Sequence, residues 1–435
     1  MLGRVRNSGT VFQTAALTRV PAGRVSVRGL AKGSAAVLLT SLLVTTPLTA
    51  TGKDIAFDEL QAEDPGASIA LDWQRTALRT MFVEPATPFP IPASPLYLGF
   101  SSLAVDDAVG TALGKGASAS AAAAVAAHDV LVAYFPASTT NLDADLTKSL
   151  AAVPNGHAER DGIEIGRAAA AAVVASRVDD GRNAQVVYTR DPKPGVWQPP
   201  PTGMAVAWLG FVKPLVLPNP ITVDGPDPID SAAYATDFNE VKSLGSATSK
   251  KRTAAQTGTA KFYSANIVLQ LREALLDHLD SHPVSLERTA QLFAALDAAT
   301  ADSLIQAWRL KYDIGCWRPF QAIPAADTDG NDATEADAKW MPLLQPATPP
   351  YPDYVSGHAV VVSAFTATVG PVLGNDVSLT IKSGTNPKRT YSSLSAIEKD
   401  ALPARIWLGI HFRDAMDDGY RLGHLTGEQV RTELG

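Results

Sequence analysis

Three short segments in the second half of the chain carry residues that could bind and transform an oxyanion. The first contains Lys311 and Arg318, seven residues apart, with Pro319 directly after the arginine. At 3.6 residues per turn this spacing places both cations on one face of a helix, which the proline is expected to end. Two cations on a helix face are usually solvated, but the residues around this pair are largely apolar.

The second segment is Ser356, Gly357 and His358, which directly precede an apolar stretch. Serine is a favoured N-cap, so we expect a helix to begin here, and the free N–H groups and positive dipole end of a helix suit an anion. Gly357 lets the backbone approach a ligand closely, and His358 could donate or accept a proton. Alone, the tripeptide would indicate only a helix cap.

The third segment contains Arg405 and His411, six residues apart and separated mostly by apolar residues. A solvated surface does not explain this pattern. Burying a guanidinium and an imidazole without a partner costs several kcal/mol. The segment therefore predicts an anion between the two side chains.

Together the segments resemble the superfamily of type 2 phosphatidic acid phosphatases and vanadium-dependent haloperoxidases. The family pattern is lysine, six residues and Arg-Pro, then Pro-Ser-Gly-His, then Ser-Arg, five residues and histidine. All three parts occur here in that order, with Val355 in place of the proline and Ala404 in place of the serine. From about Lys250 onward the chain looks like the secreted bacterial haloperoxidase-like branch.

The resemblance implies a role for each residue of the three segments. The oxygens of vanadate or phosphate would be bound by Lys311, Arg318, Ser356, Gly357 and Arg405. His411 would bond directly to vanadium or phosphorus, and His358 would act as acid and base on the opposite side. Lys311 would also polarise the bound peroxide.

Three auxiliary residues follow from the same resemblance. An acidic residue shortly after the family's nucleophilic histidine often orients the imidazole ring. Asp414 is the nearest candidate, with Asp417 and Asp418 as competitors and a surface charge as the alternative. Trp308 and Tyr351 match aromatic positions near the halide site of fungal chloroperoxidases, where Tyr351 replaces a phenylalanine; both are equally compatible with simple core packing.

The resemblance implies a vanadium-dependent haloperoxidase, an oxidoreductase that uses vanadate as cofactor and hydrogen peroxide and halide as partners. The alternative is a secreted acid phosphatase that hydrolyses a phosphomonoester through a phosphohistidine, and a remote one is a non-catalytic relic. Bulky residues near the motifs predict a narrow mouth that favours peroxide and halide, namely Trp308, Trp317, Tyr351 and Tyr354.

The rest of the chain predicts an all-α fold of helical bundles packed around the oxyanion site. Helical spacing of apolar residues recurs in four stretches: Ala117–Tyr134, Ala158–Val178, Thr259–His278 and Ser285–Lys311. His128 lies among apolar neighbours and is expected to be packed and hydrogen-bonded. Proline is dense in Arg190–Asp230, which predicts either a covering of the pocket mouth or a plain linker.

Composition and charge limit the remaining possibilities. The 435 residues are 46% apolar with a net charge of −7, which argues against a general nucleic-acid binder. Residues 1–50 combine basic residues, an apolar run and small residues, as in a secretory signal peptide, and no other apolar run is long enough to span a membrane. Residues 51–435 would then form the helical domain, with its catalytic half at about 251–435. A homodimer is compatible with these features.

Overall fold

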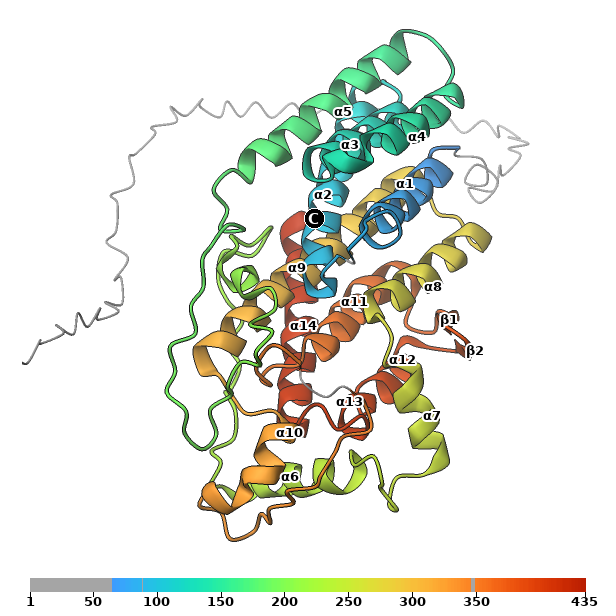
Figure 1. The fold of residues 1–435 in the computed structure, drawn as a ribbon. Helices are drawn as coiled ribbons and strands as arrows, with labels where there is room; N and C mark the ends of the chain where they lie inside the picture. The colour runs from blue at the N-terminus through green and yellow to red at the C-terminus, as the bar shows by residue number, and fades with distance from the viewer. Residues whose placement is uncertain (1–64, 88, 346–348) are drawn as a thin grey trace, which may run out of the picture. The chain divides into compact units, whose positions relative to one another are not determined.

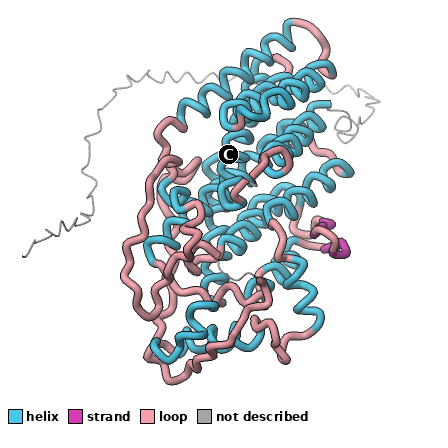
Figure 2. The backbone as a smooth tube through the Cα atoms, viewed as in Figure 1, coloured by secondary structure: helices cyan, strands magenta, loops and turns pink. Residues whose placement is uncertain are grey.

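The computed structural model describes residues 65–87, 89–345 and 349–435, which are mainly helical (Figures 1 and 2). This confirms the predicted all-α class. The export signal expected in residues 1–50 lies outside the described residues. The first helices are α1 (Pro65–Phe82), η1 (Ile91–Ala93), α2 (Ser94–Lys115), α3 (Ala119–Tyr134), η2 (Pro136–Ser138), α4 (Thr139–Ala151) and α5 (His157–Ser176).

The second half contains the longest helices and a small hairpin. Its helices are η3 (Ala207–Phe211), α6 (Ala232–Leu244), α7 (Ala254–Phe262), α8 (Ile267–Ser281), α9 (Leu286–Ile314), α10 (Pro319–Ala322), η4 (Ile323–Thr328), α11 (Gly357–Leu373), α12 (Leu394–Ala401), α13 (Ala404–Trp407) and α14 (Arg413–Leu434). Strands β1 (Leu379–Ser383) and β2 (Asn386–Tyr391) pair antiparallel.

Helix α2 and the alanine-rich helices α3 and α5 contact one another closely. Small side chains permit this approach: a Cβ at Gly166 of α5 would lie 2.9 Å from Cβ of Val125 on α3. His128 of α3 is buried, with Nδ1 2.7 Å from the Asp129 carboxylate and Nε2 3.0 Å from that of Asp143. This confirms that His128 is a packed, hydrogen-bonded histidine.

The start of α11 is held in place by α14. Three glycines of α14, Gly419, Gly423 and Gly427, follow at intervals of four and therefore lie on one face of the helix. A Cβ at Gly419 would come within 2.8 Å of the Ser356 carbonyl oxygen. The N–H of Ser356 in turn donates to Ala415 O at 2.7 Å. The close approach of the two helices thus fixes the segment that was expected to bind the anion.

The end of α9 differs from expectation. The helix stops at Ile314 because Gly315 adopts a left-handed conformation, with φ of 69°, and closes the helix as its C-cap. Arg318 instead precedes α10, in which Pro319 is the first residue. The prediction that Lys311 and Arg318 share one helix face is therefore wrong.

Two further details were not foreseen. The predicted helix Thr259–His278 is divided into α7 and α8, because the side chain of Asn266 accepts the N–H groups of Val268 and Leu269 and so caps a new helix. The β1–β2 hairpin was also not predicted, because the sequence was interpreted as helical.

The proline-rich segment Arg190–Asp230 contains no α-helix, as predicted from its prolines. It lies along α9 (Figure 1, green). The Asp302 carboxylate of α9 accepts the backbone N–H groups of Leu215, Val216 and Leu217 at 2.5, 2.9 and 2.8 Å. A carboxylate with three such donors holds the segment as an ordered part of the fold.

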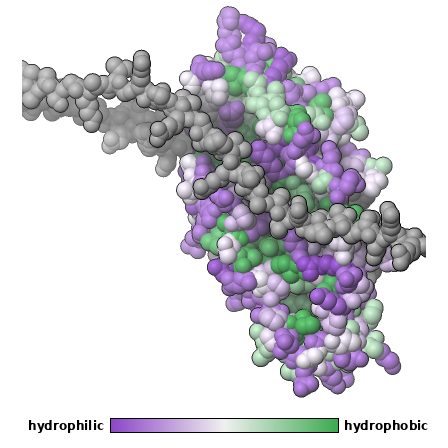
Figure 3. Space-filling model, turned by 90° about the vertical axis from the view of Figure 1, so that its left-hand side faces the viewer, coloured by the Kyte–Doolittle hydropathy of each residue, from purple (hydrophilic) through white to green (hydrophobic). Residues whose placement is uncertain are grey.

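Within the described residues, no single helix meets the length and hydropathy needed to cross a bilayer; α3 together with Pro136–Ala151 meets them only as a pair bent by 119°. Figure 3 shows one face of the molecule, on which apolar side chains form small groups among polar ones.

The N-cap of α9 provides a test of how this helix is stabilised. The side chain of Ser285 accepts the N–H of Arg288 at 3.2 Å. Ser285→Ala should lower the free energy of unfolding by about 1 kcal/mol, since the N–H loses its partner. Urea titration followed by circular dichroism measures the change. Ser285→Asp, which keeps an acceptor, is the control and should stay near the parent value; equal losses in both variants would refute a capping role.

Candidate functional site

Six of the predicted residues line one pocket of about 310 Å³. Among the residues that line it are Trp308, Tyr351, Gly357, His358, Arg405 and His411. Lys311, Arg318 and Ser356 are buried, with at most 1% of each exposed. The three sequence segments, which are up to about a hundred residues apart, are therefore brought together by the packing of α9, α11 and the α13–α14 connection.

Lys311 is fully buried on α9, where its Nζ donates to the carbonyl oxygens of Pro352 and Asp353 at 3.0 and 2.9 Å. Its Nζ also lies 5.6 Å from the ring centre of Trp308. Burial and the nearby Arg318 guanidinium lower the pKa of Lys311 well below its ordinary value. A bound anion would oppose this effect and favour the charged ammonium.

Arg318 lies at the centre of the site. Its Nε donates to Tyr351 O at 3.1 Å and its Nη1 to Ile410 O at 2.6 Å, and Nη1 is also 3.2 Å from Nε2 of His411. Its Nη2 is buried and has no hydrogen-bond partner in the described part of the chain. Burial lowers the pKa of the guanidinium. Arg318 is therefore held by the protein on one side and has a free donor on the other.

Arg405 on α13 is also held by the protein through one nitrogen while another has no partner in the described part of the chain. Its Nη1 donates to Tyr263 O at 3.2 Å, while its Nε is buried without a partner among the residues described. Burial lowers the pKa of Arg405 to about 10. A desolvated guanidinium nitrogen without an acceptor is costly, so a ligand oxygen is the expected partner.

The ring of His411 is positioned by a carboxylate that the sequence prediction overlooked. Nδ1 of His411 lies 2.9 Å from Oδ1 of Asp353, although neither atom makes a hydrogen bond of good geometry. Burial and the neighbouring cations, Arg318 first, lower the pKa of His411 well below its ordinary value. The imidazole is therefore neutral near pH 7. With Nδ1 turned toward a carboxylate, Nε2, which contacts Nη1 of Arg318 at 3.2 Å, is the nitrogen whose lone pair a ligand can take in exchange for that contact.

Asp414 does not have the orienting role that was expected of it. Its carboxylate accepts the N–H of Asp227 at 3.1 Å, and its own N–H donates to Asp237 at 2.7 Å. Asp414 lies in the first turn of α14, and its hydrogen bonds lead to α6 and the proline-rich segment and not to His411. Burial raises the pKa of Asp414 to about 7.

Asp353 takes the place expected for Asp414. It is 1% exposed, its Oδ2 accepts the N–H of Phe412 at 3.3 Å, and its Oδ1 is 3.7 Å from Nη1 of Arg318. Burial raises its pKa to about 6, against the opposing effect of the Arg318 and Lys311 charges. A signal existed in the sequence: Asp353 lies three residues before Ser356, in a stretch otherwise made of proline and apolar or aromatic residues.

His358 faces the pocket from the first turn of α11. Its Nε2 lies 3.1 Å from the carbonyl oxygen of Ala401, so Nε2 carries the proton and Nδ1 is left as the nitrogen that can accept one. Burial and the charge of Arg405 lower the pKa of His358 well below its ordinary value. The neutral imidazole can therefore exchange protons at this wall of the pocket.

Ser356 is the N-cap of α11, as predicted, and its Oγ accepts the N–H of Ala359 at 3.4 Å. Gly357 has a second function that was not foreseen. A Cβ at this position would lie 2.9 Å from the Trp308 ring. Glycine therefore lets the indole pack against the start of the helix.

Of the four bulky aromatic residues that were predicted to narrow the pocket mouth, two line the pocket and two do not. Trp308 and Tyr351 line the pocket, with ring centres 5.2 Å apart. Trp317 and Tyr354 are not among its lining residues; the Tyr354 hydroxyl donates to Asp418. The prediction that four bulky side chains narrow the mouth is therefore wrong for these two. Ala205 and Val206 of the proline-rich segment line the pocket, which confirms that this segment covers part of the site.

These features suit an oxyanion such as vanadate or phosphate. Among the contacts described above, the buried Lys311 and Arg318 and the half-buried Arg405 have one buried carboxylate near them, that of Asp353. Donor nitrogens of Arg318 and Arg405 have no acceptor in the described residues. A di- or trianion would supply both the missing charge and the missing acceptors.

Comparison with known proteins agrees with this chemistry. A family model described as the VCPO second helical-bundle domain matches residues 291–434. Vanadium chloroperoxidase of Curvularia inaequalis is 36% identical over 78 residues, which are 16% of this chain and 12% of that protein. The match thus spans about an eighth of the length of that relative.

Two solved structures share the fold. A bacterial vanadium-dependent iodoperoxidase superposes with a TM-score of 0.65 at 19% identity, over 85% of this chain and 96% of the other. An apo-type bacterial vanadium-dependent chloroperoxidase gives 0.63 at 15% identity, over 79% and 93%. Fold, family model and the complete set of motif residues agree. They support the assignment of the chain to the superfamily that joins the vanadium-dependent haloperoxidases and the type 2 phosphatidic acid phosphatases.

Proposed function

We propose that this chain is a vanadium-dependent haloperoxidase, which oxidises halide with hydrogen peroxide at vanadate bound through His411. The observation that carries the anion site of this proposal is the pair of buried donor nitrogens on Arg318 and Arg405, which have no partner among the described residues, beside the neutral imidazole of His411. The relatives named above, which are vanadium enzymes by their descriptions, support the same choice.

Each residue would contribute in a way that follows from its surroundings. Lys311, Arg318 and Arg405 would neutralise the oxyanion in a buried site, where charge pairs interact more strongly than in water. The Ser356 hydroxyl and the Gly357 N–H lie at the N-terminus of α11, which favours negative charge. Bound vanadate would supply Lewis-acid activation of peroxide without a change in oxidation state. His358 would accept and return protons at Nδ1.

The pocket volume favours a second candidate, a phosphatase. About 310 Å³ leaves room for an organic leaving group above the anion site. In that reaction Nε2 of His411 would attack phosphorus, the P–O bond to the leaving group would break, and a protonated His358 would donate a proton to the departing oxygen. Both reactions need the same cations.

One parallel assay separates the two candidates. The purified protein is incubated with orthovanadate, hydrogen peroxide and bromide and a phenolic dye, and separately with a phosphomonoester without vanadate. We expect dye bromination that depends strictly on vanadate. Efficient phosphomonoester hydrolysis without halide oxidation from acidic to neutral pH would identify the phosphatase instead. Failure of both reactions would point to a non-catalytic protein.

Phosphate should inhibit the peroxidase reaction, because it carries the same charge and shape to the same cations. The rate of bromination should fall as phosphate is raised and recover when orthovanadate is added in excess. The measurement is a steady-state titration at fixed peroxide and bromide. Sulfonate buffer of matched ionic strength is the control for screening. Turnover indifferent to millimolar phosphate would place the reaction elsewhere in the protein.

We also propose that residues 1–50 direct export, on the basis of their basic and apolar composition. Mass spectrometry of the mature protein is the test. A secreted form that begins near residue 50 is expected, whereas an intracellular form with the intact N-terminus would contradict export.

A further inference from the structure

A second cluster of hydrogen-bonded ionisable side chains lies outside the anion pocket, around the Glu398 carboxylate of α12. Its Oε1 accepts the Thr366 hydroxyl and lies 3.0 Å from Nε2 of His424, and its Oε2 accepts the Tyr420 hydroxyl at 3.0 Å. Thr366 belongs to α11, whereas Tyr420 and His424 belong to α14. One carboxylate therefore attaches the short helix α12 to two long helices.

The Glu398 side chain is 14% exposed, so its contacts are largely shielded from water. Burial favours the neutral acid, but the hydrogen bonds from His424 and Thr366 outweigh burial and lower the pKa of Glu398 below its ordinary value. The carboxylate is therefore ionised near pH 7. Hydrogen bonds to an ionised acceptor are shorter and stronger than those between neutral groups. The attachment of α12 should accordingly be firm.

The carbonyl oxygen of Ala401 lies one turn further along α12. Ala401 is the last residue of that helix and is fully buried. Because the last four carbonyl groups of a helix have no partner within the helix, this oxygen can accept a side-chain donor. The donor is Nε2 of His358, at 3.1 Å. Glu398 and Ala401 are three residues apart, so the same face of α12 makes both contacts with α11.

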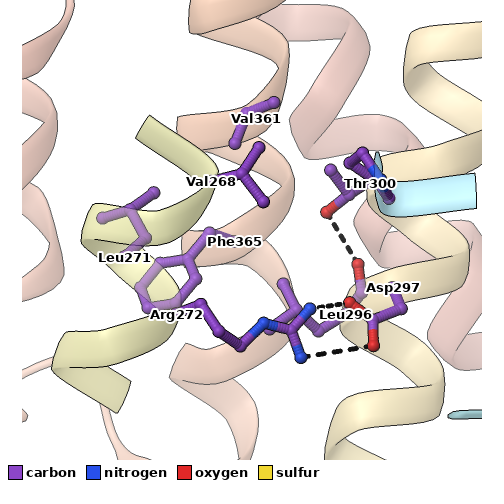
Figure 4. Close-up of a pocket in the computed structure, with 9 residues that line it drawn as sticks. Val268, Leu271, Arg272, Leu296, Asp297, Thr300, Val361 and Phe365 are labelled. Carbon is purple, nitrogen blue, oxygen red and sulfur yellow. Dashed lines mark hydrogen bonds and ion pairs between the residues drawn. The ribbon is translucent and has the colours of Figure 1, made fainter. Parts of the chain in front are cut away.

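Helix α11 is also held by other helices, so it should not move with α12. Val361 and Phe365 of α11 are 6% and 2% exposed and lie beside α8 and α9, next to the buried ion pair of Arg272 and Asp297 (Figure 4). Loss of the carboxylate contacts should therefore displace the end of α12 and leave the first turn of α11 in place.

The position of the Ala401 carbonyl determines which nitrogen of His358 carries the proton. A neutral imidazole has one N–H donor and one acceptor nitrogen. His358 is buried, so an Nε2–H group without an acceptor would be costly there. Moving the carbonyl away therefore favours the tautomer with the proton on Nδ1. That tautomer cannot accept a further proton at Nδ1.

We propose that Glu398 is a positioning residue for His358: through α12 it keeps the Ala401 carbonyl against Nε2 and so leaves Nδ1 as the proton-accepting nitrogen. Glu398 is not among the residues that line the anion pocket, so it acts only through α12. Its effect on the tautomer is independent of the reaction catalysed. Its effect on turnover rests on the proposed function, in which His358 accepts and returns protons at Nδ1.

The first experiment observes the His358 tautomer by two-dimensional 1H–15N NMR of the whole protein labelled with 15N-histidine, without vanadate. The His358 signals are those that disappear in His358→Gln. The parent protein should show the Nε2–H tautomer alone, whereas Glu398→Ala should show both tautomers. Glu398→Gln keeps an acceptor oxygen for the neighbouring hydroxyls and should therefore lie between the two.

Two control variants separate positioning from a general loss of stability. Lys399→Ala changes the next, exposed residue of α12, and Ser285→Ala weakens the N-cap of α9; both should show the parent tautomer. Circular dichroism and thermal unfolding establish that each variant is folded. If Glu398→Ala does not fold, Glu398→Gln and Tyr420→Phe, which each remove part of the contacts, replace it. The parent tautomer in every folded variant of Glu398 and Tyr420, or an equal change in Ser285→Ala, would overturn the proposal.

The second experiment measures turnover with vanadate, peroxide and bromide. The kcat of Glu398→Ala should fall about tenfold, which is part of the roughly 10²- to 10⁴-fold that a positioned acid–base group contributes. The Kd for orthovanadate should change less, because Lys311 and Arg318 lie outside α12. Glu398→Gln should recover part of kcat. Parent kcat in a variant with an altered tautomer would overturn the role of Glu398 in turnover. An altered tautomer, with no bromination by the parent protein either, would overturn the peroxidase function and leave the positioning of His358 established.

Discussion

His411→Ala should lose all measurable turnover, whether the protein is assayed as a peroxidase or as a phosphatase. Nε2 of this residue is the nitrogen available to bond to vanadium or phosphorus, because Nδ1 faces the Asp353 carboxylate. Removing the bonding atom also removes the neutral group around which the three cations are arranged. We expect a fall of at least about three orders of magnitude, since a covalent or coordinate bond has no substitute in the pocket.

Two measurements check this result. Equilibrium dialysis with orthovanadate should show much weaker binding to His411→Ala than to the parent protein, and acid-quenched incubation with a labelled phosphomonoester should give no phosphohistidine. His282→Ala, at an exposed position at the end of α8, is the control and should retain parent activity. Retention of most activity by folded His411→Ala would refute the assignment of this histidine.

Asp353→Ala should have the second-largest effect. Its carboxylate contacts the imidazole of His411 and the guanidinium of Arg318, and it accepts the N–H of Phe412. Loss of a carboxylate that orients a ligating histidine typically weakens metal affinity or activity by about 10- to 100-fold. The change also leaves Arg318 and Lys311 without the carboxylate that the described residues place beside them, so we expect a loss of roughly 3 kcal/mol in the free energy of unfolding.

Conservative variants separate orientation from stability. Asp353→Asn keeps the shape of the side chain and an acceptor oxygen, so it should recover part of the folding stability. A positioning role predicts that kcat and vanadate affinity remain reduced in Asp353→Asn even where the protein is folded, and that Asp353→Glu recovers part of them. Asp417→Asn, at an acidic residue on the exposed face of α14, is the control. Parent kcat and vanadate affinity in folded Asp353→Asn would contradict the role.

Some parts of the site could be predicted because they depend on local sequence. The N-cap at Ser356 and the end of regular structure in the proline-rich segment follow from the intrinsic preferences of serine and proline. An anion between Arg405 and His411 was inferred from the cost of burying these residue types without a partner, and the convergence of Lys311 and Arg318 with them was implied by the family resemblance. All of them lie at or directly behind the pocket.

Other parts could not be predicted, because they are set by contacts between segments far apart in the chain. Asp414 was predicted because it lies close to His411 in sequence, but its carboxylate accepts the N–H of Asp227 instead. The carboxylate that contacts His411 belongs to Asp353, which lies 58 residues earlier in the chain. Trp317 and Tyr354 are a second example: both lie beside the motifs in the sequence, but neither lines the pocket in the folded chain.

The sequence by itself thus predicted an oxyanion site, from the cost of burying Arg405 and His411 and from the resemblance of its three motif segments to one superfamily. Tertiary structure decided which carboxylate faces His411, how close α14 could come to Ser356, and how much space remains above the anion. The physical reason is that residue type sets the cost of burial, whereas orientation and volume depend on the packing of whole helices against one another.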